Sequence, residues 1–546
     1  MGALGEEQHQ RGVAGSPAIC AESTQKGRPI RAHVAIAVSK EAFIRLAQTA
    51  LPWASLGIAA ALASGIYLAG TAGTGILGFP LDDAWIHQTY ARNLAQSGTL
   101  AFVPGQPSAG STSPVWSALL SISYLLGIEP RAWAYALGFL CLLLTGWLAS
   151  RLAARLFPGQ RGVSLLTGLF CVLEWHLVWA AVSGMETVLF TALSLLAVDR
   201  AYVDLKRPSA RRDVLLGLLV GLLPLVRPEG IVLGGLIVLM LLAGPDLPWQ
   251  RKAGAAATTM AVAGLVLAPY LAFNLRTAGA LFPNTFYAKQ AEYQLALSLP
   301  ERILRVAWPP WVGAQVMLAP GVLAAAAWFL HRRSWTRLVP FAWWACLVGG
   351  YALRLPASYQ HGRYLMPVIP WLVIYGIGGM ERLLRPNARQ AAIRLASRAL
   401  PIATAVLVPV FLVLGARAYR TDVGFIEGEM VQAARWVARH TAPGTQIAAH
   451  DIGAMGYFAE RPILDLAGLV TPEVIPFITD ADQLLDFMLA QDTHYAVFFP
   501  DFSPTYEELA VRDALQEVYR TDYGWTRTQG LANMAVYRIR SPNDAE

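Results

Sequence analysis

Two adjacent carboxylates, Asp82 and Asp83, stand out in this 546-residue sequence because they follow a long apolar stretch, in the segment FPLDDAWIHQTYARN (79–93). One aspartate before a helix that begins near Ala84 is explained by capping, because its oxygens accept free N–H groups of the first turn. Capping needs only one carboxylate, however, and two neighbours repel unless a cation or a metal stabilises both. Because perturbed carboxylate pairs favour active sites, we interpret the pair as a candidate catalytic centre.

Four further polar segments contain candidate substrate-binding residues: Glu186 in SGMET, Arg227 and Glu229 in LVRPEG, Asn284 and Lys289 in FPNTFYAK, and His361 and Arg363 in YQHGRYLMP. Arginine suits phosphate because its planar fork donates two parallel hydrogen bonds. Structural alternatives are a salt-bridged turn at 227–229 and a proline turn at 283–284.

Other polar residues are interpreted structurally. Glu174 and His176 lie inside an apolar run, where we expect pairing with a neighbouring helix rather than catalysis. Asp451 follows a predicted strand, where a turn explains it as well as a ligand does. His87 and Arg92 are expected to tie the helix after the aspartate pair to a neighbouring domain.

The elements that position these residues are predicted to be membrane helices. Hydrophobic residues make up 55% of the chain and charged residues only 14%, against about 25% charged in soluble proteins. The net charge of +7 resides in short clusters between apolar runs, which is typical of cytoplasmic loops rather than of a nucleic-acid-binding face. The four cysteines indicate neither a disulfide framework nor a CxxC metal site.

Apolar runs of about 20 residues, the length that crosses a bilayer, predict about eleven spans. They lie at 51–70, 132–150, 163–182, 187–203, 213–227, 230–244, 254–275, 311–331, 338–354, 364–382 and 399–417. With these spans every basic cluster falls on one side, which the positive-inside bias makes cytoplasmic. The candidate site segments all fall on the other side, where a converging set of ionisable groups indicates a site. The segment 114–128 must then lie along the outer interface or re-enter the bilayer.

Three regions follow from this topology. Residues 1–45 are polar and are predicted to form a disordered cytoplasmic tail. Residues 46–419 form the transmembrane module. From residue 420 the charges return, and 446–450, 463–466, 494–500 and 534–539 have the composition of strands. We therefore predict a soluble α/β domain over 420–546, outside the cytoplasm.

In combination, these motifs resemble bacterial polytopic glycosyltransferases of the GT-C fold, with the closest similarity to mycobacterial-type terminal arabinofuranosyltransferases. The segment HDIGAMGYFAERPILDLAGL (450–469) is also similar to theirs, so the resemblance covers residues 50 to 540. It implies a mainly α, multi-pass protein of a bacterial inner membrane, with a cytoplasmic N-terminus and a C-terminal extracytoplasmic α/β domain. The implied activity is transfer of a sugar, usually with inversion, from a polyprenyl-phosphate donor to a glycan, lipid or protein acceptor.

The resemblance also implies roles for the residues. Such a transfer needs a base for the acceptor proton and cations for the leaving phosphate. Asp82, the first acid of the loop motif, is expected to be the base, and Asp83 to orient it, bind the sugar or hold a divalent cation. Dependence on Mg²⁺ or Ca²⁺ stays open, because two carboxylates supply few of about six oxygen ligands.

The expected phosphate ligands are Arg363, Lys289 and Arg227, and Glu186 and His361 are expected to contact the sugar or the acceptor. Segment 114–128 is expected to line a groove for the prenyl chain. Two other classes of function remain: a transporter or lipid flippase, which tends to show repeated halves and midplane binding groups, and a non-catalytic GT-C relative that acts as a sensor or binding protein. The lack of a visible repeat disfavours the transporter or flippase, and the intact acidic pair disfavours the non-catalytic relative.

Overall fold

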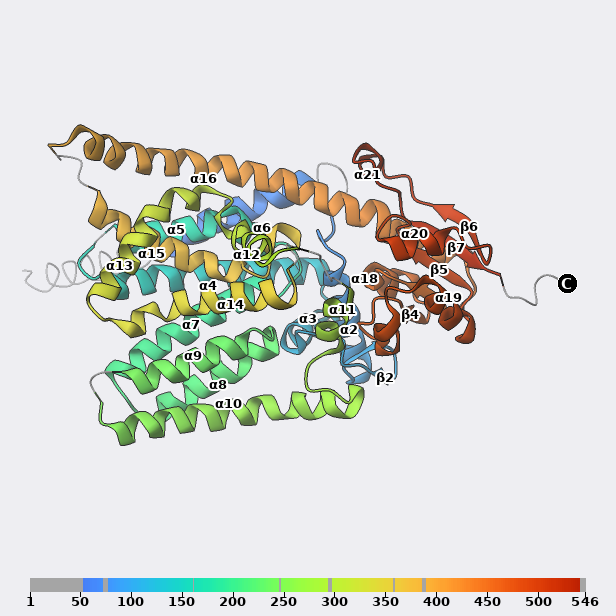
Figure 1. Ribbon diagram of the computed structural model, residues 1–546, viewed down its shortest axis with the longest axis horizontal. Helices are drawn as coiled ribbons and strands as arrows, with labels where there is room; N and C mark the ends of the chain where they lie inside the picture. Colours follow the sequence, from blue (N-terminus) through green and yellow to red (C-terminus); the bar gives the residue numbers. More distant parts are fainter. Residues whose placement is uncertain are drawn as a thin grey trace, which may run out of the picture. The chain divides into compact units, whose positions relative to one another are not determined.

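The computed structural model describes residues 53–71, 77–160, 162–244, 247–292, 297–356, 359–384 and 389–540. The predicted tail at 1–45 lies outside these ranges. Residues Trp53–Glu546 form one compact unit. Within it, long helices form a bundle, and a mixed α/β region lies at one end of that bundle (Figure 1).

Helices occupy the positions of all the predicted spans. They are the helix Trp53–Thr71, α4 (Pro130–Leu156), α5 (Val163–Leu173), α6 (Trp175–Ala181), α7 (Thr187–Lys206), α8 (Ala210–Val226), α9 (Gly230–Ala243), α10 (Trp249–Ala278), α13 (Ala319–His331), α14 (Val339–Arg354), α15 (Ile369–Leu383) and α16 (Ala391–Ile426). Six helices in the described ranges are long and apolar enough to cross a membrane, and a bent pair makes a seventh. The membrane character is therefore supported, whereas the total of eleven spans stays a prediction.

The predicted span at 163–182 is broken at Glu174, and the two halves, α5 and α6, are inclined by 56°. Glu174 has extended backbone, and its carboxylate accepts a hydrogen bond from the N–H of Leu177 at 3.0 Å. Its other oxygen lies 2.8 Å from Nδ1 of His176. The expected pairing with a neighbouring helix is thus wrong, because these two residues pair with each other at the start of α6.

Small residues let helices of the bundle approach closely. A β-carbon on Gly379 of α15 would lie 1.9 Å from the carbonyl oxygen of Gly321 in α13. Glycine lowers the intrinsic stability of a helix interior, but here it permits contact between two backbones, which is a common way for membrane helices to pack.

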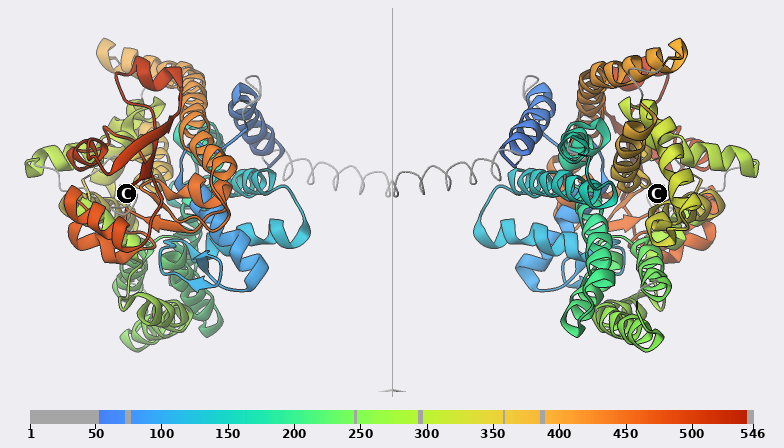
Figure 2. Two further views of the ribbon diagram at one scale, coloured as in Figure 1. Left: turned by 90° about the vertical axis from the view of Figure 1, so that its right-hand side faces the viewer. Right: turned by 90° about the vertical axis from the view of Figure 1, so that its left-hand side faces the viewer.

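The basic clusters lie far from the α/β region. The helices α10 and α16 both begin at the opposite end of the bundle (Figure 1). Arg251, Lys252 and Arg394 lie in their first turns, and Arg398 lies one turn later in α16. Seen from the end that carries the α/β region, this region lies in front of the helices (Figure 2, left). The two ends of the bundle therefore differ in chemistry as the charge pattern predicts.

Shorter elements connect the long helices. Near the α/β region these are α2 (Asp83–Ser97), β1 (Ala101–Val103), β2 (Gln106–Pro107), α3 (Pro114–Leu126) and α11 (Asn284–Glu292). The short helix α12 (Leu299–Ala307) packs against α14. Short helical turns are η1 (Pro309–Trp311), η2 (Ala314–Leu318), η3 (Trp335–Leu338), η4 (Gln360–Gly362) and η5 (Met366–Val368). With 13 residues, α3 is too short to span a bilayer, in agreement with the prediction for 114–128.

The C-terminal region begins without a break in the chain. The predicted boundary at 419/420 falls inside α16, which continues through η6 (Glu427–Val431) into α17 (Gln432–His440). A five-stranded sheet follows, in the order β4 (Ile463–Asp465), β3 (Ile447–Ala449), β5 (Tyr495–Phe498), β7 (Ala535–Ile539) and β6 (Leu515–Arg520).

In this sheet β4, β3 and β5 are parallel, whereas β7 pairs antiparallel with β5 and β6. The four predicted strands are confirmed, and β6 was missed because most of its side chains are exposed and polar. The remaining helices are α18 (Ile452–Ala454), η7 (Met455–Ala459), η8 (Pro472–Phe477), α19 (Ala481–Ala490), α20 (Pro504–Ala510) and α21 (Gly524–Thr528).

Candidate active site

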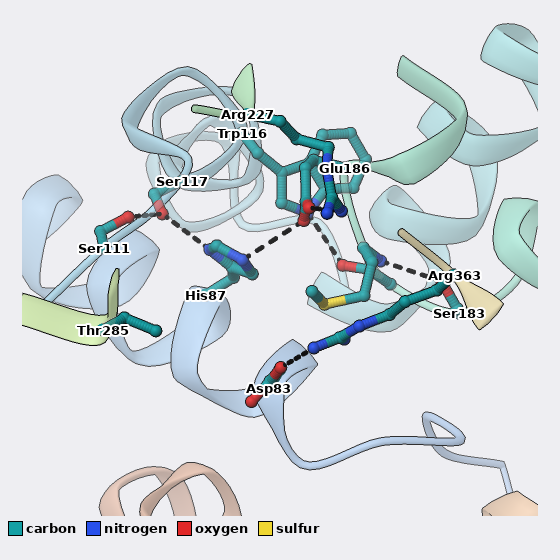
Figure 3. Close-up of polar contacts among 12 residues, drawn as sticks. Asp83, His87, Ser111, Trp116, Ser117, Ser183, Glu186, Arg227, Thr285 and Arg363 are labelled. Carbon is teal, nitrogen blue, oxygen red and sulfur yellow. Dashed lines mark hydrogen bonds and ion pairs between the residues drawn. The ribbon is translucent and has the colours of Figure 1, made fainter. Parts of the chain in front are cut away.

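The carboxylate of Asp83, at the start of α2, meets two cations from distant parts of the chain. Arg363, which follows η4, donates a hydrogen bond to Asp83 Oδ2 (Figure 3), and Nζ of Lys289 in α11 lies 3.6 Å from the same oxygen. Burial alone raises the pKa of the Asp83 carboxyl, but Lys289 and Arg363 hold this pKa well below its usual range. Asp83 is therefore ionised, with two of the predicted phosphate ligands beside it.

The Arg363 side chain is only 3% exposed, yet it keeps unused donors. Its Nε and Nη1 atoms are buried and make no hydrogen bond to the described residues. Lys289 Nζ lies 3.4 Å from the hydroxyl of Tyr364 and 5.2 Å from the ring centroid of Tyr359. Because buried charged donors are costly to leave unpaired, this arrangement favours an anion with more oxygens than one carboxylate, such as a phosphate.

Asp82 contacts the C-terminal region instead. Its two carboxyl oxygens accept hydrogen bonds from the N–H groups of Gly453, at 2.6 Å, and Ala454, at 2.7 Å. The capping alternative is wrong, because the Asp82 side chain makes no cap hydrogen bond to α2. Burial, followed by the neighbouring Asp451, raises the pKa of Asp82 to about 7, although the two N–H groups lower it.

Two other residues of α2 were expected to tie it to a neighbouring domain. Arg92 donates to the carbonyl oxygens of Tyr457, at 3.0 Å, and Gly456, at 3.1 Å, which confirms the prediction for Arg92. The prediction for His87 is wrong. Its Nδ1 lies 3.3 Å from the Ser117 hydroxyl, and its Nε2 lies 3.4 Å from Glu186 (Figure 3).

A first cavity of about 340 Å³ opens beside Asp83. Arg227 lies in its polar wall and donates to Glu186 and Glu229, each at 2.8 Å. Nε of Arg227 and Oε2 of Glu229 are buried without a hydrogen-bond partner in the described part of the chain. The salt-bridged turn expected at 227–229 is therefore present, and the same residues keep polar atoms for a ligand.

The remainder of the first cavity is apolar. Its walls include Ile231 and Val232 of α9, Cys346 and Leu347 of α14, and Phe286 of α11. Such a surface beside an anion site suits an amphiphile with a charged head. No residue of α3, all of which is described, lines this cavity or the second one, so the expectation that segment 114–128 lines a groove for the prenyl chain stays a prediction.

A second cavity, of about 370 Å³, lies between α2, α11, α16 and the C-terminal region. The two cavities share one wall, which is formed by Asp83, Ile86, Lys289, Arg363 and Leu469. Of the described carboxylates, Asp83 alone lines both cavities, whereas Asp82 lines only the second. A group in each cavity can therefore approach Asp83 from opposite sides.

Two predicted ligands line neither cavity. His361 Nε2 lies 2.8 Å from Asp422 Oδ2, and its ring packs between those of Trp175 and Trp179, with centroid distances of 5.3 Å. Asn284 is buried at the start of α11, where its backbone N–H donates to the carbonyl of Ala109 at 3.1 Å. His361 therefore supports the loop that carries Arg363, and Asn284 supports the start of α11, which carries Lys289, rather than facing the cavities.

Comparison with known proteins identifies the fold. Residues 418–537 match a family described as a domain of unknown function, DUF8728, and no curated protein matches the sequence. The crystal structure of ArnT from Cupriavidus metallidurans in the apo state is similar with a TM-score of 0.58 at 17% identity, and the match covers 90% of this chain and 98% of ArnT.

A second ArnT structure, bound to undecaprenyl phosphate, is similar with a TM-score of 0.57 at 16% identity, over 88% of this chain and 97% of ArnT. An oligosaccharyltransferase from Archaeoglobus fulgidus, tethered to an acceptor peptide, is similar with a TM-score of 0.59 at 13% identity, over 86% of this chain and 71% of that chain. These proteins are GT-C glycosyltransferases. The chain has the GT-C fold.

The GT-C fold predicted from the motif combination is thus confirmed, whereas the closer resemblance to arabinofuranosyltransferases stays a prediction. In this GT-C fold, the aspartate loop and the cations of α11 and η4 meet at the end of the bundle that carries the α/β region (Figures 1 and 3). The predicted convergence of distant polar segments therefore holds for Asp83, Lys289 and Arg363.

The sequence leaves open whether a divalent cation binds at the aspartate pair. The described residues bring together no group of three or more His, Cys, Asp or Glu side chains suited to a metal ion. The oxygens of Asp82 face backbone N–H groups, and Asp83 Oδ2 faces two side-chain cations. These N–H groups and cations occupy the places beside the carboxylate oxygens where a metal ion would bind. The residues present therefore do not fit a metal ion in this arrangement.

Several residues that line the second cavity were not predicted, among them Glu292, Tyr359, Asp422, His450 and Trp525. Asp422 could have been predicted as a site residue, because it is a carboxylate at the outer end of the last apolar run. The contact of His450 with Glu292, at 2.7 Å across 158 positions of sequence, depends on tertiary packing and left no pattern in the chain.

Proposed function

We propose that the protein is a membrane glycosyltransferase that moves a sugar from a polyprenyl-phosphate donor to a hydroxyl group of an acceptor outside the cytoplasm. The observation that carries the proposal is an ionised carboxylate, Asp83, flanked by two cations in the wall between two cavities. Transfer between two substrates needs this combination of a base and a phosphate site at one point.

The first cavity is assigned to the donor. Its phosphate would bind Lys289 and Arg363, whose Nε and Nη1 have no partner among the described residues, and the prenyl chain would lie along the apolar surface between α9 and α14. The donor sugar would meet the unpartnered polar atoms of Arg227 and Glu229, with Glu186 beside them. ArnT, which has a similar fold, has been crystallised with undecaprenyl phosphate, and this supports a lipid phosphate in the same general role.

We assign the base to Asp83 rather than to Asp82. A base must touch the acceptor hydroxyl while lying close to the anomeric carbon of the donor, and Asp83 lines both cavities. The acceptor oxygen forms the new bond to the anomeric carbon as the bond from that carbon to the phosphate oxygen breaks. The donor phosphate competes with Asp83 for Arg363 and Lys289, so the carboxylate becomes more basic when the donor is bound. The hydroxyl proton passes to Asp83, and the polyprenyl phosphate leaves with its negative charge stabilised by Arg363 and Lys289.

Attack and departure on opposite sides of the anomeric carbon give inversion, which agrees with acceptor and donor lying in separate cavities. Carboxylates near the oxocarbenium-like centre stabilise its developing positive charge, and Asp83 is one of them. No step requires a metal ion in this scheme. Metal dependence stays a prediction, which is checked by measuring turnover in EDTA and again after addition of Mg²⁺ or Ca²⁺.

Proteoliposomes test the proposal against the transporter or flippase alternative and against a non-catalytic relative. The purified protein is reconstituted with radiolabelled polyprenyl-phosphate sugars and a hydroxyl-bearing sugar acceptor, and release of polyprenyl phosphate is measured by thin-layer chromatography. A glycosyltransferase cleaves the labelled donor, and Asp83→Asn abolishes cleavage, whereas the matched variant Asp486→Asn in α19 does not. Movement of intact donor across the bilayer without cleavage would support a flippase, and neither event would support a non-catalytic role.

The proposed location is a bacterial inner membrane, with the N-terminus in the cytoplasm and the C-terminal region outside. The separation of the basic clusters from the site along the bundle supports this orientation (Figure 1). Protease treatment of intact spheroplasts should cleave the region after residue 440, and protection of that region would contradict the orientation.

A further inference from the structure

The second cavity has an acidic and aromatic lining that the transfer step alone does not require. Five carboxylates line it, together with Lys289, Arg363 and His450; the carboxylates belong to Asp82, Asp83, Glu292, Asp422 and Asp451. Lys289 and Arg363 pair with Asp83 in the wall shared with the first cavity. Away from that wall, carboxylates therefore outnumber cations.

Each of the carboxylates away from the shared wall already has a hydrogen-bond donor. Asp422 Oδ2 lies 2.8 Å from His361 Nε2 and accepts from Trp179 Nε1 at 2.9 Å. Glu292 Oε1 lies 2.7 Å from His450 Nε2. Burial lowers the pKa of His450, but Asp451 and Glu292 raise it well above its usual value, so this one cation offsets part of the negative charge. The carboxylates keep lone pairs that accept hydrogen bonds from hydroxyl groups.

Aromatic rings complete the cavity. Phe425 of α16 and Trp525 of α21 pack edge to face with their centroids 5.8 Å apart, and Tyr359, in the loop that carries Arg363, also lines the cavity. The Trp525 side chain is 38% exposed. Oε1 of Gln360, next to Tyr359, is buried with no hydrogen-bond partner among the described residues, so the cavity also offers an unused polar atom.

Taking the proposed transfer as given, we propose that this cavity binds the acceptor and selects an uncharged, hydroxyl-rich sugar over an anionic acceptor. Hydroxyl groups would donate to Asp422, Glu292 and Gln360, while the apolar face of a sugar ring would pack on Trp525. A phosphate or carboxylate on the acceptor would meet like charge, which costs several kcal/mol at an interface. The C-terminal part of the lining, including His450 and Trp525, lies within the segment that matches DUF8728, so that region supplies acceptor recognition.

The proposal is tested by comparing one disaccharide in three forms: the neutral p-nitrophenyl glycoside, its 6-phosphate and its 2-amino counterpart. Calorimetry on the full chain without donor measures binding of each, and transfer from a polyprenyl-phosphate sugar gives kcat/KM. We expect the neutral sugar to bind at least tenfold more tightly than the phosphate. Asp422→Asn keeps an oxygen for His361 and Trp179 but removes the charge, so it should narrow this ratio at least threefold.

Trp525→Ala should raise the KM for the acceptor at least fivefold and leave the KM for the donor unchanged. Matched controls are Asp482→Asn in α19 and Trp335→Ala between α13 and α14, whose side chains are 73% and 61% exposed, and both should behave as wild type. The amino sugar should bind at least as tightly as the neutral one, because its ammonium group meets the carboxylates of the lining. Equal or tighter binding of the phosphorylated sugar, or an unchanged ratio in Asp422→Asn, overturns the proposal. Because binding is measured without donor, failure of glycosyl transfer itself is detected separately as absence of donor cleavage.

Discussion

Replacement of Asp83 by asparagine should move catalysis and donor binding in opposite directions. The carboxylate accepts a hydrogen bond from Arg363 and lies 3.6 Å from Lys289, so in the absence of donor it competes with a phosphate for both cations. The asparagine side chain would be neutral and similar in size. The variant therefore loses the proposed base and at the same time releases two cations for the donor phosphate.

The expected magnitudes follow from these contacts. Loss of a general base reduces turnover by a factor of about 10² to 10⁴. Two unit charges 4 Å apart interact by about 4 kcal/mol at an effective dielectric constant of 20. Only part of this interaction energy becomes donor-binding energy, because the Asp83 side chain is 28% exposed and the two cations are desolvated in the complex. We expect the binding free energy of the donor to improve by about 1.4 kcal/mol, which corresponds to tenfold tighter binding.

Donor binding is measured by calorimetry with a polyprenyl-phosphate sugar in detergent micelles, and turnover is measured with the same donor and excess acceptor. Asp82→Asn is the matched control, because its carboxylate contacts the backbone of α18 and lines only the second cavity. It should leave donor affinity unchanged. Wild-type turnover in Asp83→Asn would refute the base assignment, and weaker donor binding would show that Asp83 holds the cations in place instead of competing for them.

Three further predictions concern the phosphate site, the pH dependence and the packing of the bundle. Arg363→Lys keeps the charge but loses the guanidinium fork, so donor affinity measured by calorimetry should fall about tenfold. The folded-state pKa of Asp82 is raised from 3.8 to about 7; its protonation therefore stabilises the fold, and Tm should fall as pH rises across this interval. Asp82→Asn should flatten that dependence, as followed by thermal scans. Gly379→Ala places a β-carbon 1.9 Å from a carbonyl of α13 and should lower Tm by several degrees, whereas Gly349→Ala meets no atom within 4 Å and should not.

Local patterns predicted the elements well, because the long helices and most strands are encoded in runs of adjacent residues. The apolar runs coincide with helices throughout the bundle, and the strands β3, β4, β5 and β7 are short buried runs. The edge strand β6 was not predicted, because its mostly exposed and polar side chains give it the sequence pattern of a polar loop. The break at Glu174 was not predicted either. One carboxylate in an apolar run can pair with a neighbouring helix or cap the start of a new helix, and the sequence does not distinguish these two cases.

The partners of the site could be predicted only as a set. Asp83 and Arg363 are separated by 280 positions, so their contact depends on packing. Asp82 and Asp83 are adjacent, and their sequence context is almost the same. Their directions differ because α2 begins at Asp83, and successive residues at a helix start point about 100° apart. One carboxylate consequently faces the cations and the other faces the C-terminal region.

The loop that carries Arg363 illustrates how residues outside the cavities determine the site. Its backbone is constrained, with φ of 30° at Gln360 and 59° at His361, in the region that disfavours residues with a β-carbon. The contacts of the His361 ring with Asp422 and with the rings of Trp175 and Trp179 stabilise this conformation. Both tryptophans belong to α6, whose direction follows from the break at Glu174. The broken span and the strained turn are therefore parts of one arrangement, and its consequence is that the buried guanidinium of Arg363 points at Asp83 (Figure 3).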